Sequence, residues 1–215
     1  MGTLELISQL RNTTGAGMMD CKKALEEADG DMQKAQDILR KKGAVKAAKR
    51  EGKVAAEGAV ASYIHAGGRI GVLLELNCET DFVGKTDGFQ ELARELCLHI
   101  AAANPRYLAR EDVPAAVLER ERAVYVDQMK AEGKPQNIID KAVEGKLNAF
   151  YKEVCLLEQA FIKDEEKTVR GLLDEKVAEL GEKITLRRFS RFELGEGIEK
   201  TKTDFAAEVA EQLGG

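Results

Sequence analysis

Residues 59–77 read AVASYIHAGGRIGVLLELN, and this stretch decides the fold class. Alternating β-branched and aromatic residues predict a strand over 59–66, and an apolar run predicts a second strand over 70–77. Gly67 and Gly68 separate the two strands, and glycine accepts the positive φ angles that a tight turn demands. The stretch therefore predicts an antiparallel hairpin, which is the start of a small sheet.

Amphipathic helical patterns precede this hairpin. Residues 4–43 carry three short apolar stripes separated by glycine-containing turns, and Asp31 is placed to cap the third helix. The sequence Lys-Lys-Gly at 41–43 predicts the end of that helix. We therefore expect a miniature three-helix domain, followed by a basic linker over 40–53 that is helical only in part.

Further helices follow the hairpin. Asp87 and Gln90 form a capping box for one helix, which ends at Pro105. Residues 114–154 keep a helical stripe that is interrupted only by Gly-Lys-Pro at 133–135, and this predicts two long antiparallel helices that project as a coiled coil. The remaining expected elements are a helix capped by Thr168, a strand over 184–194 and a short helix over 204–213.

These elements predict the α+β class, with one small antiparallel sheet, many helices and no alternating βα repeat. Each part of the chain receives one expected role. The divisions are an N-terminal three-helix domain with its linker (1–54), a core hairpin and helix (55–112), a helical hairpin or coiled coil (113–157), a return to the core with a strand (158–200) and a C-terminal helical module (201–215).

Composition excludes several classes of protein. The 215 residues include 33 Lys+Arg and 38 Asp+Glu, a formal net charge of −5, and 44% are apolar. Apolar residues in such number and periodicity exclude wholesale disorder, and no run approaches the ~18 uncharged apolar residues that a membrane span needs. The N-terminus lacks a basic region followed by an apolar stretch, so we expect an intracellular, cytoplasmic protein that binds no membrane.

Cysteine and histidine spacing indicates neither a metal site nor an enzyme. The four cysteines are scattered without a CxxC pair, and His65 and His99 add no zinc-ligand spacing. We expect reduced, mostly buried thiols, and we expect His99 to be a satisfied helix-face residue. No Ser-His-Asp or Cys-His set is present, so we expect no catalytic residues, no metal and no cofactor. The cysteines are Cys21, Cys78, Cys97 and Cys155.

The segment 78–84, CETDFVG, is unusually apolar for a loop between a strand and a capped helix. It places Phe82 and Val83 beside the carboxylates of Glu79 and Asp81. One interpretation tucks Phe82 under the hairpin as a core residue. The other makes Phe82 an exposed wedge that inserts into a partner. The residues alone leave both interpretations open.

A second candidate surface lies at the start of the second expected helix. Met18 belongs to the stripe expected to face the core, and Met19 follows it directly. Only one of two adjacent side chains faces a helical core comfortably, so we expect the other to be exposed beside Lys22 and Lys23. An exposed methionine is an adaptable contact, but simple surface scatter explains the pattern equally well.

Three segments, in this order, resemble bacterial elongation factor Ts in its short form with a single core repeat. Residues 10–25 read LRNTTGAGMMDCKKAL, residues 77–83 read NCETDFV, and the C-terminal segments 192–200 and 203–210 read FELGEGIEK and TDFAAEVA. Together with the helical hairpin they cover nearly the whole chain. The resemblance implies a guanine-nucleotide exchange factor that binds elongation factor Tu in its GDP-bound and nucleotide-free forms.

The resemblance also implies which residues act. The N-terminal helices would be of the ubiquitin-associated type and would dock on the nucleotide-binding domain of the partner. The core loop would dislodge the magnesium that holds GDP. The loop residues are Thr80, Asp81, Phe82 and Val83; the implied docking residues are Arg11, Met18, Met19, Lys22 and Lys23, with Asp204 and Phe205 from the C-terminal helix.

The chain departs from the longer members of the family it resembles, which carry two copies of a core subdomain. Its hairpin over 62–71 resembles that of the second copy, yet it runs directly into 80–83, which resembles the first. One fused copy leaves a small sheet with an open edge, and open edges invite pairing. We therefore expect a homodimer whose two halves replace the missing duplication.

Two other functions remain open at this stage. An accessory module that binds RNA or the ribosome would use the basic run 40–53, although this run lacks interleaved aromatic residues and the chain is acidic overall. We expect no direct contact with nucleic acid. A peptide-binding adaptor would use only the first domain and would leave 80–83 without a role.

Overall fold

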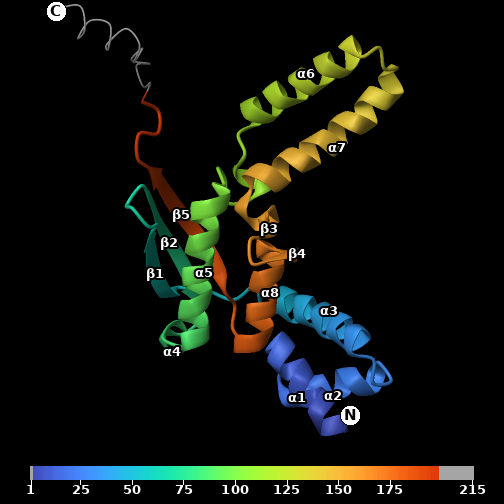
Figure 1. Cartoon of the computed structure of the whole chain (residues 1–215), viewed down its shortest axis with the longest axis vertical. Coiled ribbons are helices and arrows are strands. Elements are labelled where there is room, and N and C mark those ends of the chain that lie inside the picture. Colours follow the sequence, from blue (N-terminus) through green and yellow to red (C-terminus); the bar gives the residue numbers. More distant parts are fainter. Residues whose placement is uncertain (1, 199–215) are drawn as a thin grey trace, which may run out of the picture.

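The computed structural model describes residues 2–198 and is built around a three-stranded antiparallel sheet. The strand order is β1-β2-β5, with β1 at Glu57–Ile64, β2 at Ile70–Cys78 and β5 at Thr185–Glu193. Helix α5 (Asp87–Ala103) lies along one face of the sheet with α8 (Val169–Leu180) beside it (Figure 1). The sheet and its helices match the expected α+β class.

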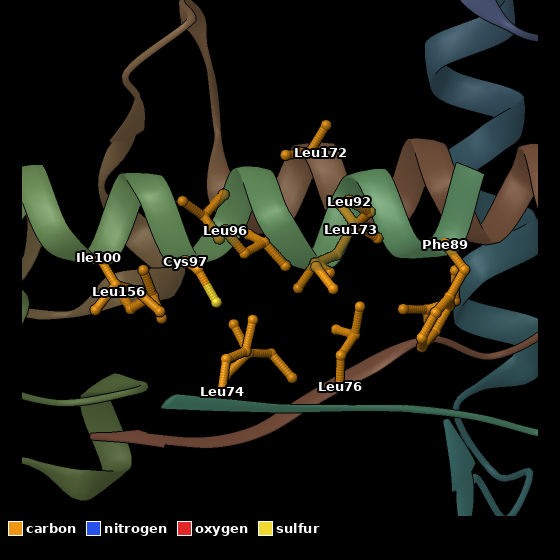
Figure 2. Close-up of a cluster of buried hydrophobic side chains, with 14 of the residues drawn as sticks. Leu74, Leu76, Phe89, Leu92, Leu96, Cys97, Ile100, Leu156, Leu172 and Leu173 are labelled. Atoms are coloured by element: carbon orange, nitrogen blue, oxygen red, sulfur yellow. The ribbon is translucent and has the colours of Figure 1, made fainter. Parts of the chain in front are cut away.

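The main hydrophobic core fills the space between β2 and α5. Leu74 and Leu76 point up from β2 toward Leu96 and Phe89 on α5, and Leu172 enters from α8 behind them (Figure 2). Alternation along β2 sends every second side chain into this core, because successive side chains of a strand point to opposite faces. The opposite face of the sheet has no covering element among residues 2–198.

The hairpin turn is longer than the predicted two-residue turn. The N–H of His65 donates to the carbonyl of Ile70 at 2.9 Å, so four residues lie between this pair. Gly67 and Gly68 both have positive φ, at 85° and 68°, as the turn prediction required. Strand β1 ends at Ile64 because the chain begins to turn there.

The N-terminal helices are α1 (Thr3–Thr14), α2 (Met18–Glu27) and α3 (Met32–Arg50). They enclose a small core of their own, and Asp31 caps α3 by accepting a hydrogen bond from the N–H of Lys34. The predicted helix end at Gly43 is wrong, since α3 continues through the run expected to be a linker. Gly43 is buried where α3 packs on α8, and a Cβ there would make an ordinary contact with Ala178 at 3.5 Å.

The helical hairpin projects from the far end of the molecule (Figure 1). It consists of α6 (Ala115–Ala131) and α7 (Gln136–Val154). An apolar seam of its own closes the pair, so the hairpin needs no support from the sheet along its outer half. The buried seam residues are Met129, Ile139, Val143 and Leu147.

A second small sheet was not predicted. Strand β3 (Ala160–Phe161) pairs with β4 (Asp164–Thr168), after the 3-10 turns at Arg110–Asp112 and Leu156–Glu158. The sequence of β4, DEEKT, carries no apolar alternation that would indicate a strand. Its pairing is set by the tight turn from β3 instead.

One of the two predicted N-caps described next is wrong and the other is confirmed. Thr86, and not Asp87, is the N-cap of α5, because its hydroxyl accepts from the N–H of Phe89. Thr168 caps α8 as expected, accepting from the N–H of Gly171 at 3.1 Å. The expected C-terminal helix over 204–213 lies outside the described residues.

All four cysteines are buried free thiols. Burial raises the pKa of the Cys97 thiol to about 11, so this side chain remains protonated and behaves as a small apolar residue. Among residues 2–198, no helix combines the length and the apolar character that crossing a membrane demands.

His99 is a fully buried side chain with both ring nitrogens satisfied. Its Nδ1 accepts from the N–H of Ile162 at 3.3 Å, and its Nε2 lies 3.0 Å from Oε1 of Gln159. Because Nδ1 is an acceptor, the neutral ring carries its proton on Nε2 and donates it to Gln159. A second proton would face the N–H of Ile162, so the site favours the neutral ring.

This arrangement predicts a pH-dependent stability. Burial lowers the pKa of His99 from 6.5 despite the opposing hydrogen bond to Gln159, so the unfolded chain takes up a proton at a higher pH than the folded one. The free energy of unfolding therefore falls as the pH drops below 6.5. Urea titrations at several pH values should show a steeper loss for the wild type than for His99→Gln. Equal pH dependence in both proteins would contradict this assignment.

Candidate functional site

The segment that follows β2 is a short helical turn and not an open loop. Helix α4 (Asp81–Gly84) begins directly after Thr80, whose backbone is extended at φ −127° and ψ 153°. The Thr80 hydroxyl accepts a long hydrogen bond (3.5 Å) from the N–H of Val83, as a threonine N-cap does. This cap sets the direction in which the first helical side chains leave the backbone.

Within α4 the two apolar side chains point in opposite directions. Phe82 is 79% exposed, whereas Val83 is half-buried against the main core. The interpretation that tucked Phe82 under the hairpin is therefore wrong. Val83 anchors the turn from below, and the aromatic ring stands outward.

A glycine contact seats α4 against the edge of the sheet. A Cβ on Gly84 would lie 3.2 Å from Cα of Gly58 in β1. Gly58 has φ +128°, and a Cβ there would lie 2.2 Å from the carbonyl oxygen of Leu76. Gly58 must be glycine for this approach and a side chain at Gly84 would crowd it, so the base of the turn rests directly on the backbone of the sheet.

Hydrogen bonds close the far end of the turn. The Thr86 hydroxyl donates to the carbonyl of Val83 at 2.8 Å, and Nε2 of Gln90 donates to the carbonyl of Gly84 at 2.7 Å. Asp81 pairs with Lys85 at 2.6 Å, and this hydrogen-bonded ammonium lowers the pKa of the Asp81 carboxyl. Asp81 is therefore a carboxylate at neutral pH, one position before the exposed ring.

The second candidate surface lies where α1 ends and α2 begins. Met18 and Met19 are 55% and 63% exposed, so the expectation that one of them faces the core is wrong. The buried stripe of α2 starts only at Cys21, because Met18 lies in the first turn, beyond the surface that the other two helices cover. Arg11, Lys22 and Lys23 are also exposed.

The candidate residues of both surfaces lie toward one end of the molecule. Along its long axis, α4, α1 and α2 occupy the end opposite the α6–α7 hairpin (Figure 1). Asp204 and Phe205, the remaining implied contacts, lie outside the described residues. The fold thus brings an apolar wedge and a basic, methionine-bearing surface to the same end of the chain, although the two are about 60 residues apart in sequence.

One group of residues around the turn escaped the sequence analysis. Glu182, in the connection from α8 to β5, accepts hydrogen bonds from Thr80, and Lys183 donates its N–H to Glu79. Gly181 marks the end of α8, but no local pattern indicates that the two residues after it meet a segment about 100 positions earlier.

The chain matches a family model described as Elongation factor TS over residues 33–196. It is 60% identical over 211 residues to the elongation factor Ts of Desulfitobacterium hafniense, covering 98% of this chain and 97% of that protein. It is 60% identical over 210 residues to that of Carboxydothermus hydrogenoformans, with 98% and 97% covered. It is 55% identical over 212 residues to that of Geobacter sulfurreducens, with 99% and 98% covered. These relatives thus match the chain almost from end to end.

Proposed function

The chain belongs to the elongation factor Ts family, the nucleotide exchange factors of elongation factor Tu, and we propose that its exposed turn at 80–83 drives the release of GDP. The observation that carries this proposal is the outward ring of Phe82, 79% exposed on a base that is packed against the sheet. An exposed aromatic side chain on a rigid support is the kind of residue that dominates protein interfaces. As a member of this family, the protein is an exchange factor and not an enzyme.

The proposed mechanism acts on the magnesium of the partner. Mg²⁺ needs near-ideal octahedral oxygen coordination and commonly bridges protein side chains to a nucleotide phosphate. Insertion of Phe82 would displace the side chains that support this coordination. Once the ion is lost, GDP has lost its main ionic anchor and dissociates faster.

Thermodynamic linkage implies that the chain does not itself choose the direction of the exchange. A protein that weakens the binding of nucleotide to its partner is itself bound less tightly when nucleotide returns, and the two affinities fall by the same ratio. This chain therefore accelerates release and rebinding alike, and the prevailing nucleotide determines the outcome.

The test is the release of a fluorescent GDP analogue from elongation factor Tu in a stopped-flow instrument. We expect the full chain to accelerate release in a concentration-dependent, saturable manner. A release rate that stays at its spontaneous value at all concentrations of this chain would refute the proposed function.

We propose that Arg11, Met18, Met19, Lys22 and Lys23 form the docking surface that holds the partner while the turn acts. Reversing two of its charges, in Lys22→Glu with Lys23→Glu, should weaken binding roughly 10- to 100-fold, because like charges at an interface oppose association. The half-saturating concentration in the release assay should rise while the maximal rate changes little.

The matched control is Lys141→Glu with Lys152→Glu, which makes the same charge change at two exposed positions of α7. An equal loss of affinity in the control would attribute the effect to net charge and would count against the docking surface.

We also propose that the chain forms a homodimer through the open face of its sheet. Three cross-strand rows lie on that face: Ile64–Gly71–Phe192, Ser62–Leu73–Ser190 and Val60–Glu75–Arg188. Val60, Ile64, Leu73 and Phe192 are between 50% and 71% exposed there. Ile64, Leu73 and Phe192 border a hollow of about 490 Å³ toward the hairpin end of this face.

A second copy of the same chain is the proposed occupant of this face. The single core repeat leaves one sheet where a duplicated core has two, and stacked sheets bury their apolar faces about 10 Å apart. Arg187 and Arg188 both pair with Glu75, which lies on the middle strand in the row with Val60, so this group brings one net positive charge per chain.

A further inference from the structure

Glu182 holds the backbone that leads into the wedge. Its Oε2 accepts the N–H groups of Glu79 and Thr80 at 3.1 and 3.0 Å, and its Oε1 accepts the Thr80 hydroxyl at 2.6 Å. One carboxylate thus satisfies three donors in two consecutive residues. Thr80 is the N-cap of α4, so these bonds act immediately before the helical turn that carries Phe82.

Glu79 makes the reciprocal contact. Its Oε1 accepts the N–H of Lys183 at 2.7 Å, and the guanidinium of Arg50 donates to the same oxygen at 2.8 Å. Hydrogen bonding by the Lys183 N–H is the main cause that lowers the pKa of the Glu79 carboxyl, so this group is ionised at neutral pH. We call the pair Glu79 and Glu182, with their crossed hydrogen bonds, the carboxylate clamp.

The carboxylate clamp also reaches the N-terminal helices. Arg50 is the last residue of α3, and the Nζ of Lys183 donates to the carbonyls of Glu51 and Lys53 at 2.6 and 2.9 Å. The end of α3, the start of α4 and the connection from α8 to β5 therefore meet at one polar junction. This junction lies between the docking surface on α1 and α2 and the wedge on α4.

The folded core does not depend on this junction for its apolar packing. Glu182 and Glu79 are only partly buried, and neither belongs to the main hydrophobic cluster. Strands β2 and β5 are already joined by a ladder from Ile70 to Asn77, with one register shift between Glu75 and Leu76. The hydrogen bonds of Glu182 thus add orientation to a segment whose place in the sheet is secured by other contacts.

We propose that Glu182 is a positioning residue for nucleotide exchange, which aims Phe82 by fixing the backbone of Glu79 and Thr80. This inference rests on the proposed function of the turn. Positioning matters because a Phe82 side chain that samples several directions must be ordered each time it engages the partner. Only the fraction of molecules with the ring in the right direction is then competent to act. Through Glu79 and Arg50, the same junction sets the wedge relative to the docking surface.

The expected effect is on the maximal rate rather than on affinity. Glu182→Ala should lower the maximal rate of GDP release roughly 10- to 100-fold, the scale on which small misplacements of acting groups are felt. The half-saturating concentration should change less than about threefold, because the docking surface on α1 and α2 is intact. Glu182→Gln keeps one acceptor oxygen and should fall between wild type and Glu182→Ala.

A double-mutant cycle separates positioning from stability. If Glu182 acts through Phe82, then Glu182→Ala should have no further effect on the rate once Phe82→Ala is present. The matched control is Glu132→Ala, which removes another paired glutamate, at the tip of the α6–α7 hairpin. It should leave the release kinetics at the wild-type values.

Amide hydrogen exchange supplies a readout that does not depend on the nucleotide-exchange activity. In Glu182→Ala and Glu182→Gln, the amides of Glu79 and Thr80 should exchange faster, while those paired within β2 keep their protection. If Glu182→Ala fails to fold, the test uses Glu182→Gln instead, with its rate of GDP release and its amide hydrogen exchange as the two measurements.

The outcomes distinguish this inference from the proposed function. A normal release rate with Phe82→Ala would overturn both. Two outcomes would overturn the positioning role alone, provided that Phe82→Ala releases GDP slowly. The first is a normal release rate for the folded Glu182 variant. The second is a double mutant in which the losses of release rate from the two substitutions multiply fully. Unchanged exchange of the Glu79 and Thr80 amides would also overturn it.

Discussion

Phe82→Ala is expected to slow the release of GDP from elongation factor Tu roughly 30- to 1000-fold at saturating factor, which corresponds to about 2–4 kcal/mol for an interfacial aromatic anchor. Truncation removes the ring that is proposed to displace the supports of the magnesium ion, and nothing else in α4 replaces it. Val83 cannot take over, because it faces the core of its own chain.

The fold should tolerate this change. The ring of Phe82 is 79% exposed, so its removal takes almost no packing from the protein, and the caps at Thr80 and Thr86 are untouched. The thermal midpoint should therefore stay close to that of the wild type, and complex formation through α1 and α2 should persist. These two readouts separate a loss of exchange from a loss of structure.

The control for Phe82→Ala is Ile138→Ala, which truncates an apolar side chain that is 48% exposed on α7, far from the turn. It should release GDP at the wild-type rate. If Phe82→Ala also retained that rate, the wedge mechanism would be wrong, although membership of the family would stand.

The second large effect concerns assembly. Leu73→Asp should convert the proposed homodimer into a monomer of 23.6 kDa, as measured by light scattering at micromolar concentration. Leu73 lies on the middle strand at the centre of the open face, where a dimer would enclose it. A carboxylate buried there without a partner costs several kcal/mol, which exceeds what a modest interface supplies.

This substitution should leave each subunit folded. Leu73 is 50% exposed in the single chain and points away from the core that Leu74 and Leu76 form. The control is Val124→Asp on α6, a position that is 44% exposed, which should leave the mass unchanged. A wild-type chain that is already monomeric under these conditions would contradict the proposed dimer.

The dimer and the exchange activity are separable. The open face of the sheet lies opposite the main core, whereas α4 is seated on the start of β1 and the N-terminal helices pack on α8. Monomeric Leu73→Asp should therefore still bind elongation factor Tu, and a comparison of its release rate with that of the wild type would show whether two copies act together.

Local patterns were sufficient to predict most elements of this chain. Strand alternation and the Gly67-Gly68 pair predicted the hairpin, and apolar periodicity predicted α5 and the α6–α7 pair, because these features depend on neighbours within a few residues. Asp31 and Thr168 act as the caps they were expected to be, for the same reason. The family resemblance, too, rests on contiguous segments.

Contacts between distant segments decided the rest. Gly43 looked like a helix end, but it lies inside α3, at the place where this helix packs on Ala178 of α8. Whether Phe82 faces inward or outward is likewise set by Gly58, which seats α4 on the sheet.

Local patterns along the chain were enough to predict most helices and strands and the chemical character of the turn, an aromatic ring beside a carboxylate. The direction of that ring and the contacts beneath it follow from packing between distant segments, since Glu182 meets Thr80 from 102 residues away. Helical and strand periodicity report which face of an element is apolar, but a hydrogen bond across such a separation leaves no periodic trace in the chain.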